Sequence, residues 1–468
     1  MKRHNHLIIA LFLIPLFLLA AFNLAWPNQQ VSADENRTLR QMPAFSLNSL
    51  LTGEYTVAFE DYFSDQFPLR QIFIGTRQQM LELIQAPLAG SISLVNRPEQ
   101  DIGIGERIEP DPSDMIYLPT ETTWKETEPV PEPTTETTAE TQASQETAAT
   151  QPTTAATTET AATETQVTAP TVEGKVQNYS AVIIVNDFAM EIFGFSKTRG
   201  TRYAGLVNQL QAHVPEARVF DMVAPTSIEF YSPERYHDLS SSQASAIQYI
   251  NQNLNSGVIS VDAYGRIAQH LDEYLYFRTD HHWTARGAYY AYQAFAERAG
   301  LQPVQLDALE SGRIEGDFLG SLYRYTKSSA LRNNPDFVEY HLPAVTSEGF
   351  AFSTTEMASG YKVKAVYTKT SSSNKYLVFI GGDNPLVHFK TSLTNGQSIV
   401  VLKESFGNAL VPFLLNHYED VYVIDPRSLK ANLPDFIRQH QIQDVLIINY
   451  AFSVGSATWS AGFEAMIG

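Results

Sequence analysis

The stretch that decides the fold is SIVVLKESFGNALVPFLLNHYEDVYVIDPRSLKANLPDFIRQHQIQDVLIINY, residues Ser398–Tyr450. It reads as strand, helix, strand, helix and strand, with the strands in SIVVLKE, DVYVID and DVLIIN. Strands that alternate with helices in this way lie parallel in one sheet, with helices on both faces. We therefore expect a doubly wound, mostly parallel α/β fold of three layers, similar to flavodoxin.

The chain between residue 176 and this stretch continues the alternation. Short runs rich in β-branched and aromatic residues predict strands at Tyr179–Asp187, Ala217–Pro225 and Glu273–Phe277. Helices are expected at Ser240–Asn253 and at Thr284–Ala299, the second with Thr284 as its N-cap. Between Gly349 and Lys369 the pattern changes to that of antiparallel strands, which indicates a small inserted hairpin. Residues 176–468 should thus form the main domain.

The residues before the main domain divide into two parts. Residues 30–118 contain apolar side chains at helical spacing and are expected to form a helical part that packs on the main domain. Residues 119–172 are dominated by Thr, Ala, Glu and Pro and cannot bury a core, so a disordered insert is expected. This insert is either a spacer that crosses a cell wall, with or without glycosylation, or a tolerated loop insertion.

The N-terminus predicts export of the protein. Residues 1–6 are basic, and residues 7–26 are uncharged and apolar, about the 20 residues that a helix needs to span a membrane. Lys2 and Arg3 favour a cytoplasmic N-terminus, a single-pass signal anchor and an extracellular main domain. The alternative is a signal peptide cleaved after Val31–Ala33, which would release a secreted protein.

The composition excludes several functions. The formal net charge of −19 makes nucleic acid an unsuitable partner. The chain has no cysteine, which excludes disulfides, zinc–thiolate sites and a cysteine nucleophile. No motif indicates a cofactor.

Ser405 is the first candidate for chemistry. It lies between the strand SIVVLKE and the helix FGNALVPFLL, at the edge of the sheet where doubly wound folds place their sites. As a nucleophile it would have the N–H of Phe406, in the first helical turn, beside any oxyanion. The alternative is that Ser405 only caps the helix. Asn384 and Asn449 lie at other predicted strand ends and are candidates to contact an oxyanion or substrate.

The stretch RTDHHW, Arg278–Trp283, supplies the matching base. In an extended segment Asp280 and His282 would share one face, roughly 6–7 Å apart at Cα. The carboxylate could then hold one imidazole nitrogen while the other faces a serine, as in a Ser–His–Asp triad. His281 would point the other way. A metal site is less well supported, because the chain has no second motif of this kind. Trp283 is expected to line the core or the pocket.

These motifs resemble the DHHW family, named for Asp280–Trp283. That family is grouped with alginate O-acetylation proteins of the AlgX and AlgJ type, which are similar to SGNH hydrolases with a permuted order of motifs. Further shared stretches are ENRTL at Glu35–Leu39, FSDQFPLR at Phe63–Arg70, GGDNPL at Gly381–Leu386, KESFGNALVPFL at Lys403–Leu414 and VYVIDPR at Val421–Arg427.

The resemblance implies that Ser405 is the nucleophile, His282 the base and Asp280 its orienter. It also makes Arg427, in VYVIDPR, a candidate to contact substrate. One departure is Glu404, because the position before the serine favours Asp in SGNH hydrolases.

The implied activity is that of an extracytoplasmic serine esterase or O-acetyltransferase. The substrates would be acetyl esters of a cell-surface polysaccharide or wall glycan, and an integral-membrane acyltransferase would supply the acetyl group. The alternative is a non-catalytic protein that keeps the fold and binds glycans or assembles the cell envelope. A Ser405–His282 distance far beyond hydrogen-bond reach would favour this alternative.

Overall fold

The structure, a computed structural model, describes residues 31–32, 37–38, 41–46, 49–50, 55–56, 59, 62–63, 66–67, 107–108, 115–117, 176–178 and 181–468. The expected basic segment 1–6, anchor 7–26 and insert 119–172 lie outside these residues, as does most of the helical part 30–118. None of the helices in the described part of the chain combines the length and the apolar character needed to span a membrane.

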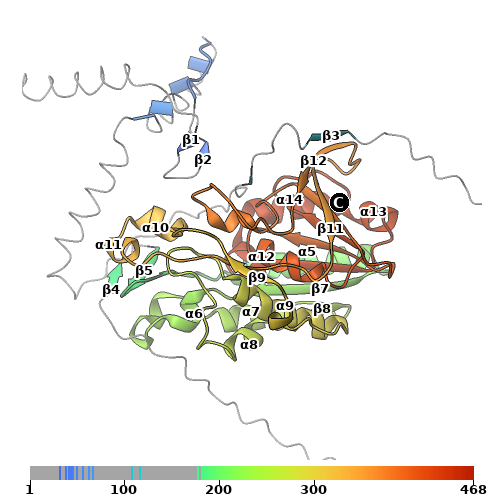
Figure 1. Cartoon of the computed structure of the whole chain (residues 1–468), viewed down its shortest axis with the longest axis horizontal. Helices are drawn as coiled ribbons and strands as arrows, with labels where there is room; N and C mark the ends of the chain where they lie inside the picture. Colours follow the sequence, from blue (N-terminus) through green and yellow to red (C-terminus); the bar gives the residue numbers. More distant parts are fainter. Residues whose placement is uncertain are drawn as a thin grey trace, which may run out of the picture.

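A sheet of nine strands forms the centre of the molecule (Figure 1). Its strands, in spatial order, are β3 (Met115–Tyr117), β12 (Ser359–Val363), β11 (Ser347–Phe352), β13 (Leu386–Thr391), β15 (Asp420–Ile424), β14 (Ser398–Lys403), β16 (Asp444–Tyr450), β7 (Arg218–Ala224) and β8 (Val258–Ser260). The four pairings from β15 to β8 are parallel. The four from β3 to β15 are antiparallel.

The expectation of a mostly parallel sheet is therefore wrong, because the described sheet is mixed. The expected hairpin exists as β11 and β12, but it is no separate insertion. β13 follows a loop instead of a helix, so it enters the sheet in the opposite direction and pairs with β15 on one side and β11 on the other. The hairpin thereby extends the same sheet.

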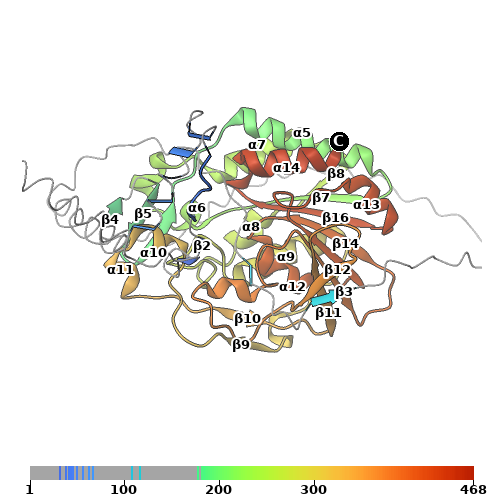
Figure 2. The same cartoon turned by 90° about the horizontal axis from the view of Figure 1, so that it is seen from above.

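Helices cover both faces of the parallel half, as a doubly wound fold requires (Figure 2). One layer contains α5 (Lys197–His213), α7 (Gln243–Gln252), α13 (Leu433–Gln439) and α14 (Ala457–Ile467); the other contains α8 (Ala263–Ala268), α9 (Ala285–Ala299) and α12 (Gly407–Leu414). The side chain of Thr284 accepts the Gly287 N–H and begins α9 as predicted, and Gly300 ends it with a φ of 73°. Every residue of β14 and β16 is buried between the layers.

Two other predicted strands differ from expectation. The run at Tyr179–Asp187 contains β5 (Val182–Val185), but β5 pairs with β4 (Val176–Asn178) and β6 (Phe188–Glu191) in a small antiparallel sheet of its own. Glu273–Phe277 is not a strand and makes only an isolated bridge, between Tyr276 and Trp283.

Short elements complete the described fold. They are β1 (Val31–Ser32) paired with β2 (Arg37–Thr38), β9 (Ser311–Arg313) paired with β10 (Glu339–His341), α6 (Ser227–Tyr231), α10 (Ser321–Thr326) and α11 (Ser329–Arg332), with 3₁₀ turns at Glu234–Leu239, Leu306–Ala308, Lys375–Val378 and Ser453–Gly455.

Several functional loops gather at the carboxyl edge of the parallel strands. β14 ends at Lys403, directly before Glu404 and Ser405. The antiparallel β13 begins at this same edge, since Leu386 pairs with Ile424 at the end of β15. The loop 381–385 therefore lies near the serine in the fold, and the Ile108 amide donates to the Gly381 carbonyl from outside the main domain, at 2.7 Å.

Candidate active site

The Asp280–Trp283 segment is a tight loop between two short antiparallel pieces of chain. The Phe277 amide donates to the His282 carbonyl, and the Thr284 amide donates to the Leu275 carbonyl. Asp336 fixes the start of the loop, because its carboxylate accepts the amides of Arg278 and Thr279 at 2.9 and 2.7 Å. The segment is held by hydrogen bonds on both sides and presents its side chains from a fixed frame.

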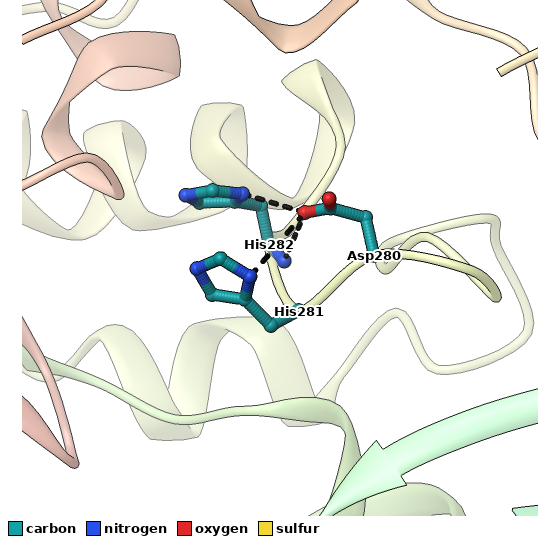
Figure 3. A group of neighbouring side chains, drawn as sticks. All are labelled: Asp280, His281 and His282. Carbon is teal, nitrogen blue, oxygen red and sulfur yellow. Dashed lines mark hydrogen bonds and ion pairs between the residues drawn. The ribbon is translucent and has the colours of Figure 1, made fainter. Parts of the chain in front are cut away.

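Within this loop Asp280 orients His282. Asp280 Oδ1 accepts the His282 amide at 3.0 Å and His282 Nδ1 at 2.6 Å (Figure 3). Its other oxygen accepts the Ser321 amide at 2.7 Å. Burial pushes the pKa of Asp280 upward, but the two histidines and these hydrogen bonds hold the pKa well below its ordinary value. The ionised carboxylate fixes a proton on Nδ1 and leaves Nε2 as the basic nitrogen.

Ser405 meets that nitrogen. Its Oγ lies 2.8 Å from His282 Nε2, although 123 residues separate the two in sequence. The helix α12 begins at Gly407 and its N-cap is Phe406, so Ser405 does not cap it. A Cβ at Gly407 would lie 2.6 Å from the Lys403 Cβ, so the turn after the serine needs glycine. Asp280, His282 and Ser405, which we call the triad, form one hydrogen-bonded chain.

Two aromatic side chains hold the two halves of the triad together. Trp283 is fully buried, and its Nε1–H donates to the Phe406 carbonyl at 2.9 Å. The Tyr376 ring stacks on the His282 ring with centroids 3.9 Å apart, and its hydroxyl donates to the Ser405 carbonyl at 3.1 Å. Trp283 thus ties the loop to the serine turn, while Tyr376 fixes the plane of the imidazole.

Glu404 occupies the place expected for an oxyanion. One carboxylate oxygen accepts the Phe406 amide at 3.1 Å and lies 3.2 Å from the Ser405 Oγ, where it competes with His282 for the hydroxyl proton. The other oxygen accepts the Tyr450 amide at 3.0 Å. Burial raises the pKa of Glu404 to about 7, against the opposing effects of Arg427 and these amides. The Phe406 N–H, predicted as an oxyanion donor, is therefore engaged by Glu404 in this structure.

The other predicted contact residues lie near this edge in two different settings. Asn384 is buried; its Oδ1 accepts from the Tyr361 hydroxyl, and its Nδ2 has no partner among the described residues. Asn449 donates to the Tyr203 hydroxyl of α5 at 3.3 Å. Asn384 keeps a donor available at this edge, whereas the described contacts of Asn449 are with the α5 layer.

Arg427 belongs to a buried charge cluster, which we define as Asp383, Lys403, Asp425 and Arg427. Arg427 Nη2 lies 2.6 Å from both Asp383 and Asp425, and Lys403 Nζ lies 2.7 Å from Asp383. Asp383, Lys403 and Asp425 are each at most 2% exposed, and the side chain of Arg427 is 1% exposed. Asp383 and Asp425 engage the Nε and Nη2 of Arg427 in this arrangement, so its role as a substrate contact stays a prediction.

His281 departs most clearly from expectation. It was expected to point away from His282, yet the two ring centroids are only 3.8 Å apart. The expected alternation holds only in extended chain, and the chain bends at residues 278–282, so both rings lie on the same side of the loop (Figure 3).

Asp280, His281 and His282 offer atoms close enough to one another to hold a metal ion. Their present hydrogen bonds use those atoms otherwise. Asp280 Oδ1 and His282 Nδ1 face each other at 2.6 Å, and His281 Nδ1 lies 2.6 Å from the Ser321 hydroxyl. An ion between them would have to break both contacts and the triad, so the arrangement fits proton transfer better than metal binding.

Three contributors to the site were not predicted. Tyr376 and Ser321 lie in segments without a recognisable motif, so their contacts could not be read locally. Gly320 is needed because a Cβ there would lie 2.2 Å from the Asp280 Cβ. Only its position directly before Ser321, in a short FLGS run, distinguishes it in the sequence.

The site joins a serine, a histidine and an aspartate in one hydrogen-bonded chain at the carboxyl edge of a doubly wound sheet. This is the arrangement of the serine hydrolase class. A sequence profile described as DHHW protein matches residues 147–424, which include the whole triad. The chain belongs to the DHHW family.

Solved structures agree with this assignment. The crystal structure of a DHHW family protein from Eubacterium siraeum is 31% identical, covers 62% of this chain and 96% of its own, and has a TM-score of 0.57. PatB1 of Bacillus cereus, solved with a sulfonyl adduct, is 16% identical, covers 62% and 99%, and has a TM-score of 0.50. That second likeness is one of fold alone.

The O-acetyltransferase domain of Pseudomonas putida AlgJ is 13% identical, covers 62% of this chain and 98% of its own, and has a TM-score of 0.35, which does not establish a common fold. No curated protein sequence matches the chain significantly.

Proposed function

We propose that this protein is an SGNH-type serine esterase or O-acetyltransferase that acts on acetyl esters of a cell-surface polysaccharide or wall glycan. The observation that carries the proposal is the continuous relay from Asp280 through His282 to the Ser405 hydroxyl, with heavy-atom distances of 2.6 and 2.8 Å. Distances of this size are those required for proton transfer between a nucleophile and its base.

In the proposed first step Ser405 Oγ attacks the carbonyl carbon of an acetyl ester and its proton passes to His282 Nε2. The C–O bond to the leaving alcohol then breaks, and His282 returns the proton to that oxygen. Ser405 is left as an acetyl ester. Water or a sugar hydroxyl next gives its proton to His282 and attacks the acetyl group, which frees Ser405. Asp280 stays ionised throughout and stabilises the imidazolium that forms in both steps.

The negative charge that develops on the carbonyl oxygen needs donors. We assign this role to Asn384 Nδ2, which is buried and has no partner among the described residues. The loop that carries it is fixed beside the serine helix, because the neighbouring Asp383 accepts from Asn408 of α12 at 2.9 Å. The Phe406 N–H becomes the second donor when the Glu404 carboxylate leaves it. Two such donors are the usual complement of an oxyanion hole.

The glycan substrate and the membrane acyltransferase partner follow from the predicted export of the protein and from the family resemblance. The N-terminal segment that predicts export, as anchor or as cleaved signal, lies outside the described residues. The contact between the serine and the histidine supports the enzyme over the alternative, a non-catalytic glycan-binding or envelope-assembly protein.

The test is turnover of p-nitrophenyl acetate by purified full-length protein, with Ser405→Ala beside the wild type. We expect Ser405→Ala to lose about 10³-fold or more of the turnover, at an unchanged circular dichroism spectrum. A matched control is Ser453→Ala, a buried serine of the same sheet edge outside the triad, which should keep its activity. Equal turnover by wild type and Ser405→Ala would overturn the proposal and favour the binding role.

A further inference from the structure

His281 is the member of the Asp280–Trp283 motif that the triad does not use. Asp280 orients, His282 is the base and Trp283 ties the loop to the serine turn. In Figure 3 the His281 ring lies next to the His282 ring, and each ring turns one nitrogen toward Asp280 and the other to the opposite side. The outer nitrogen of His282 is the one that contacts Ser405. The outer nitrogen of His281 therefore faces the same region.

The hydrogen bonds of His281 leave that outer nitrogen available. Its Nδ1 lies 2.6 Å from the Ser321 hydroxyl and 3.7 Å from Asp280, and its backbone amide donates to the same hydroxyl at 3.4 Å. Its Nε2 has no partner among the described residues. The side chain is 24% exposed, against 8% for His282, so a molecule in solvent can reach it.

We propose that His281 Nε2 binds the oxygen of the acetyl acceptor, which is water or a sugar hydroxyl, and positions it for attack on acetyl-Ser405. This proposal rests on the proposed function and names the acceptor subsite of the same site. Because the two rings are 3.8 Å apart, an oxygen placed beside His282 Nε2 is also near His281 Nε2.

In this step the acceptor oxygen forms the new bond to the acetyl carbon with one lone pair. Its proton passes to His282 Nε2, and the bond between the acetyl carbon and Ser405 Oγ breaks. Ser405 then takes the proton from His282, so no charge or atom is left over. His281 neither gains nor loses a proton; it is a positioning residue that fixes the direction of attack, an effect of orientation.

The protonation state of His281 suits this task. Burial, together with the neighbouring His282, lowers the pKa of His281 to about 4, against the opposing effect of Asp280. The ring is therefore neutral near pH 7 and does not repel the imidazolium that forms on His282 during the attack. The other charged groups that face it are Glu191 and Arg324.

A second observation argues against a purely structural role. A histidine that serves only packing is expected to have both ring nitrogens satisfied or buried in the core. His281 instead has one nitrogen fixed by Ser321, a residue whose amide also holds Asp280. Ser321, at the N-terminal end of α10, thus positions both the Asp280 carboxylate and the His281 ring. The two imidazole rings are therefore held in a fixed arrangement.

The experiment separates formation of the acetyl-enzyme from its breakdown. Full-length protein is mixed with p-nitrophenyl acetate in a quenched-flow instrument, and intact-protein mass spectrometry follows the gain and loss of one acetyl group. The variants are His281→Ala, His281→Gln and His281→Asn. A glutamine amide reaches the position of Nε2, whereas an asparagine amide reaches only that of Nδ1, so the last two form a matched pair.

We expect His281→Ala to slow deacetylation about 10- to 100-fold and to change acetylation by less than about threefold. His281→Gln should recover most of the deacetylation rate and His281→Asn should not. Ser321→Ala, which frees the ring to turn, should give a smaller slowing of the same step. Circular dichroism of each variant checks that the fold is kept.

Two results would overturn the inference. One is a deacetylation rate of His281→Ala equal to that of the wild type. The other is an equal loss in both steps with no difference between the Gln and Asn variants, which would indicate a structural role. If the wild type neither gains an acetyl group nor releases p-nitrophenol, the proposed function itself fails, and this outcome is distinct from both.

Discussion

Two sets of buried polar side chains lie at the same carboxyl edge of the sheet, and they differ in one respect. In the buried charge cluster every carboxylate meets a cation, with Asp383 held between Lys403 and Arg427. In the triad the groups are joined in a line, and the Ser405 hydroxyl contacts only His282 and Glu404 within the part of the chain that the structure describes. We call the cluster closed because its charges are matched within it, whereas the triad ends in the serine hydroxyl.

The difference separates stability from chemistry. Two cations and two carboxylates cancel in the cluster, and Lys403 joins the serine strand β14 to the loop of Asp383. Such a set fixes loops, and the charges of its described residues are matched to one another. The triad and its neighbours retain what the cluster lacks: a basic nitrogen, a hydroxyl and the Nδ2 of Asn384, which has no partner among the described residues. Substitutions in the two sets should therefore fail in opposite ways.

The largest expected effect is a loss of activity that is not accompanied by a loss of stability. His282→Ala removes the base and should lower p-nitrophenyl acetate turnover by about 10³- to 10⁴-fold. Its melting temperature should stay within a few degrees of the wild type, because His282 holds no element of the fold by itself. Turnover and thermal unfolding measured on the same sample check this. A variant that unfolded instead would place His282 among the structural groups.

The opposite effect is expected in the closed cluster. Arg427→Met leaves Asp383 and Asp425 short of a cation in the interior and should cost about 3–5 kcal/mol of unfolding free energy. The control is Arg438→Met, which breaks the exposed Arg438–Asp435 pair and should cost no more than about 1 kcal/mol. Urea unfolding measures both. Equal costs would mean that the cluster does not hold this edge together.

Glu404 lies between the two sets, and its variant tests pH dependence. A carboxyl whose pKa is raised to about 7 in the fold stabilises the protein below its unfolded pKa of about 4.3, and that stability is lost as pH rises through 7. Between pH 5 and pH 8 the wild type should therefore lose stability relative to Glu404→Gln, and the difference between their melting temperatures should change by a few degrees.

Asp221, whose pKa burial also raises to about 7, acts in the same direction in both proteins, and the lowered pKa values of His281, His341, His417 and His440 act in the opposite direction in both. Above pH 7 the ionised Glu404 also competes for the Phe406 amide and the Ser405 proton, so wild-type turnover should fall there relative to Glu404→Gln. Parallel pH profiles of the two proteins, in melting and in turnover, would contradict the placement of Glu404.

The smallest effect is expected for Tyr376→Phe. The variant keeps the ring stacked on His282 and loses only the hydroxyl that donates to the Ser405 carbonyl at 3.1 Å. One neutral hydrogen bond of about 0.5–1.5 kcal/mol predicts a loss of turnover of roughly 2- to 12-fold. Steady-state kinetics measures it. A loss as large as that of His282→Ala would give the tyrosine hydroxyl a role in the reaction itself.

The parts of the fold that the sequence predicts well are those decided by local pattern. β14, β15 and β16 are apolar runs rich in β-branched residues, and Thr284 caps α9 with its own side chain. The antiparallel half was underestimated because the neighbours of β13 in the sheet are set by pairing between distant residues. Glu273–Phe277 has strand composition, but a turn follows it too closely for a ladder to form.

The site divides in the same way. Asp280, His282 and Ser405 could be named from motifs and from their places beside predicted elements. The orientation of His281 could not, because it depends on the bend at residues 278–282. The contacts of Glu404 and Tyr376 could not either, because each joins groups brought together only by the complete fold.

The most direct test of the central claim is to locate the residue with which a sulfonyl fluoride reacts. Phenylmethanesulfonyl fluoride is incubated with full-length wild type and with His282→Gln, and peptide mass spectrometry locates the adduct. If the triad activates its serine, the sulfonyl group attaches to Ser405 in the wild type and is reduced at least about 100-fold in the variant. No adduct at Ser405, or equal labelling of both proteins, would contradict a catalytic triad in this chain.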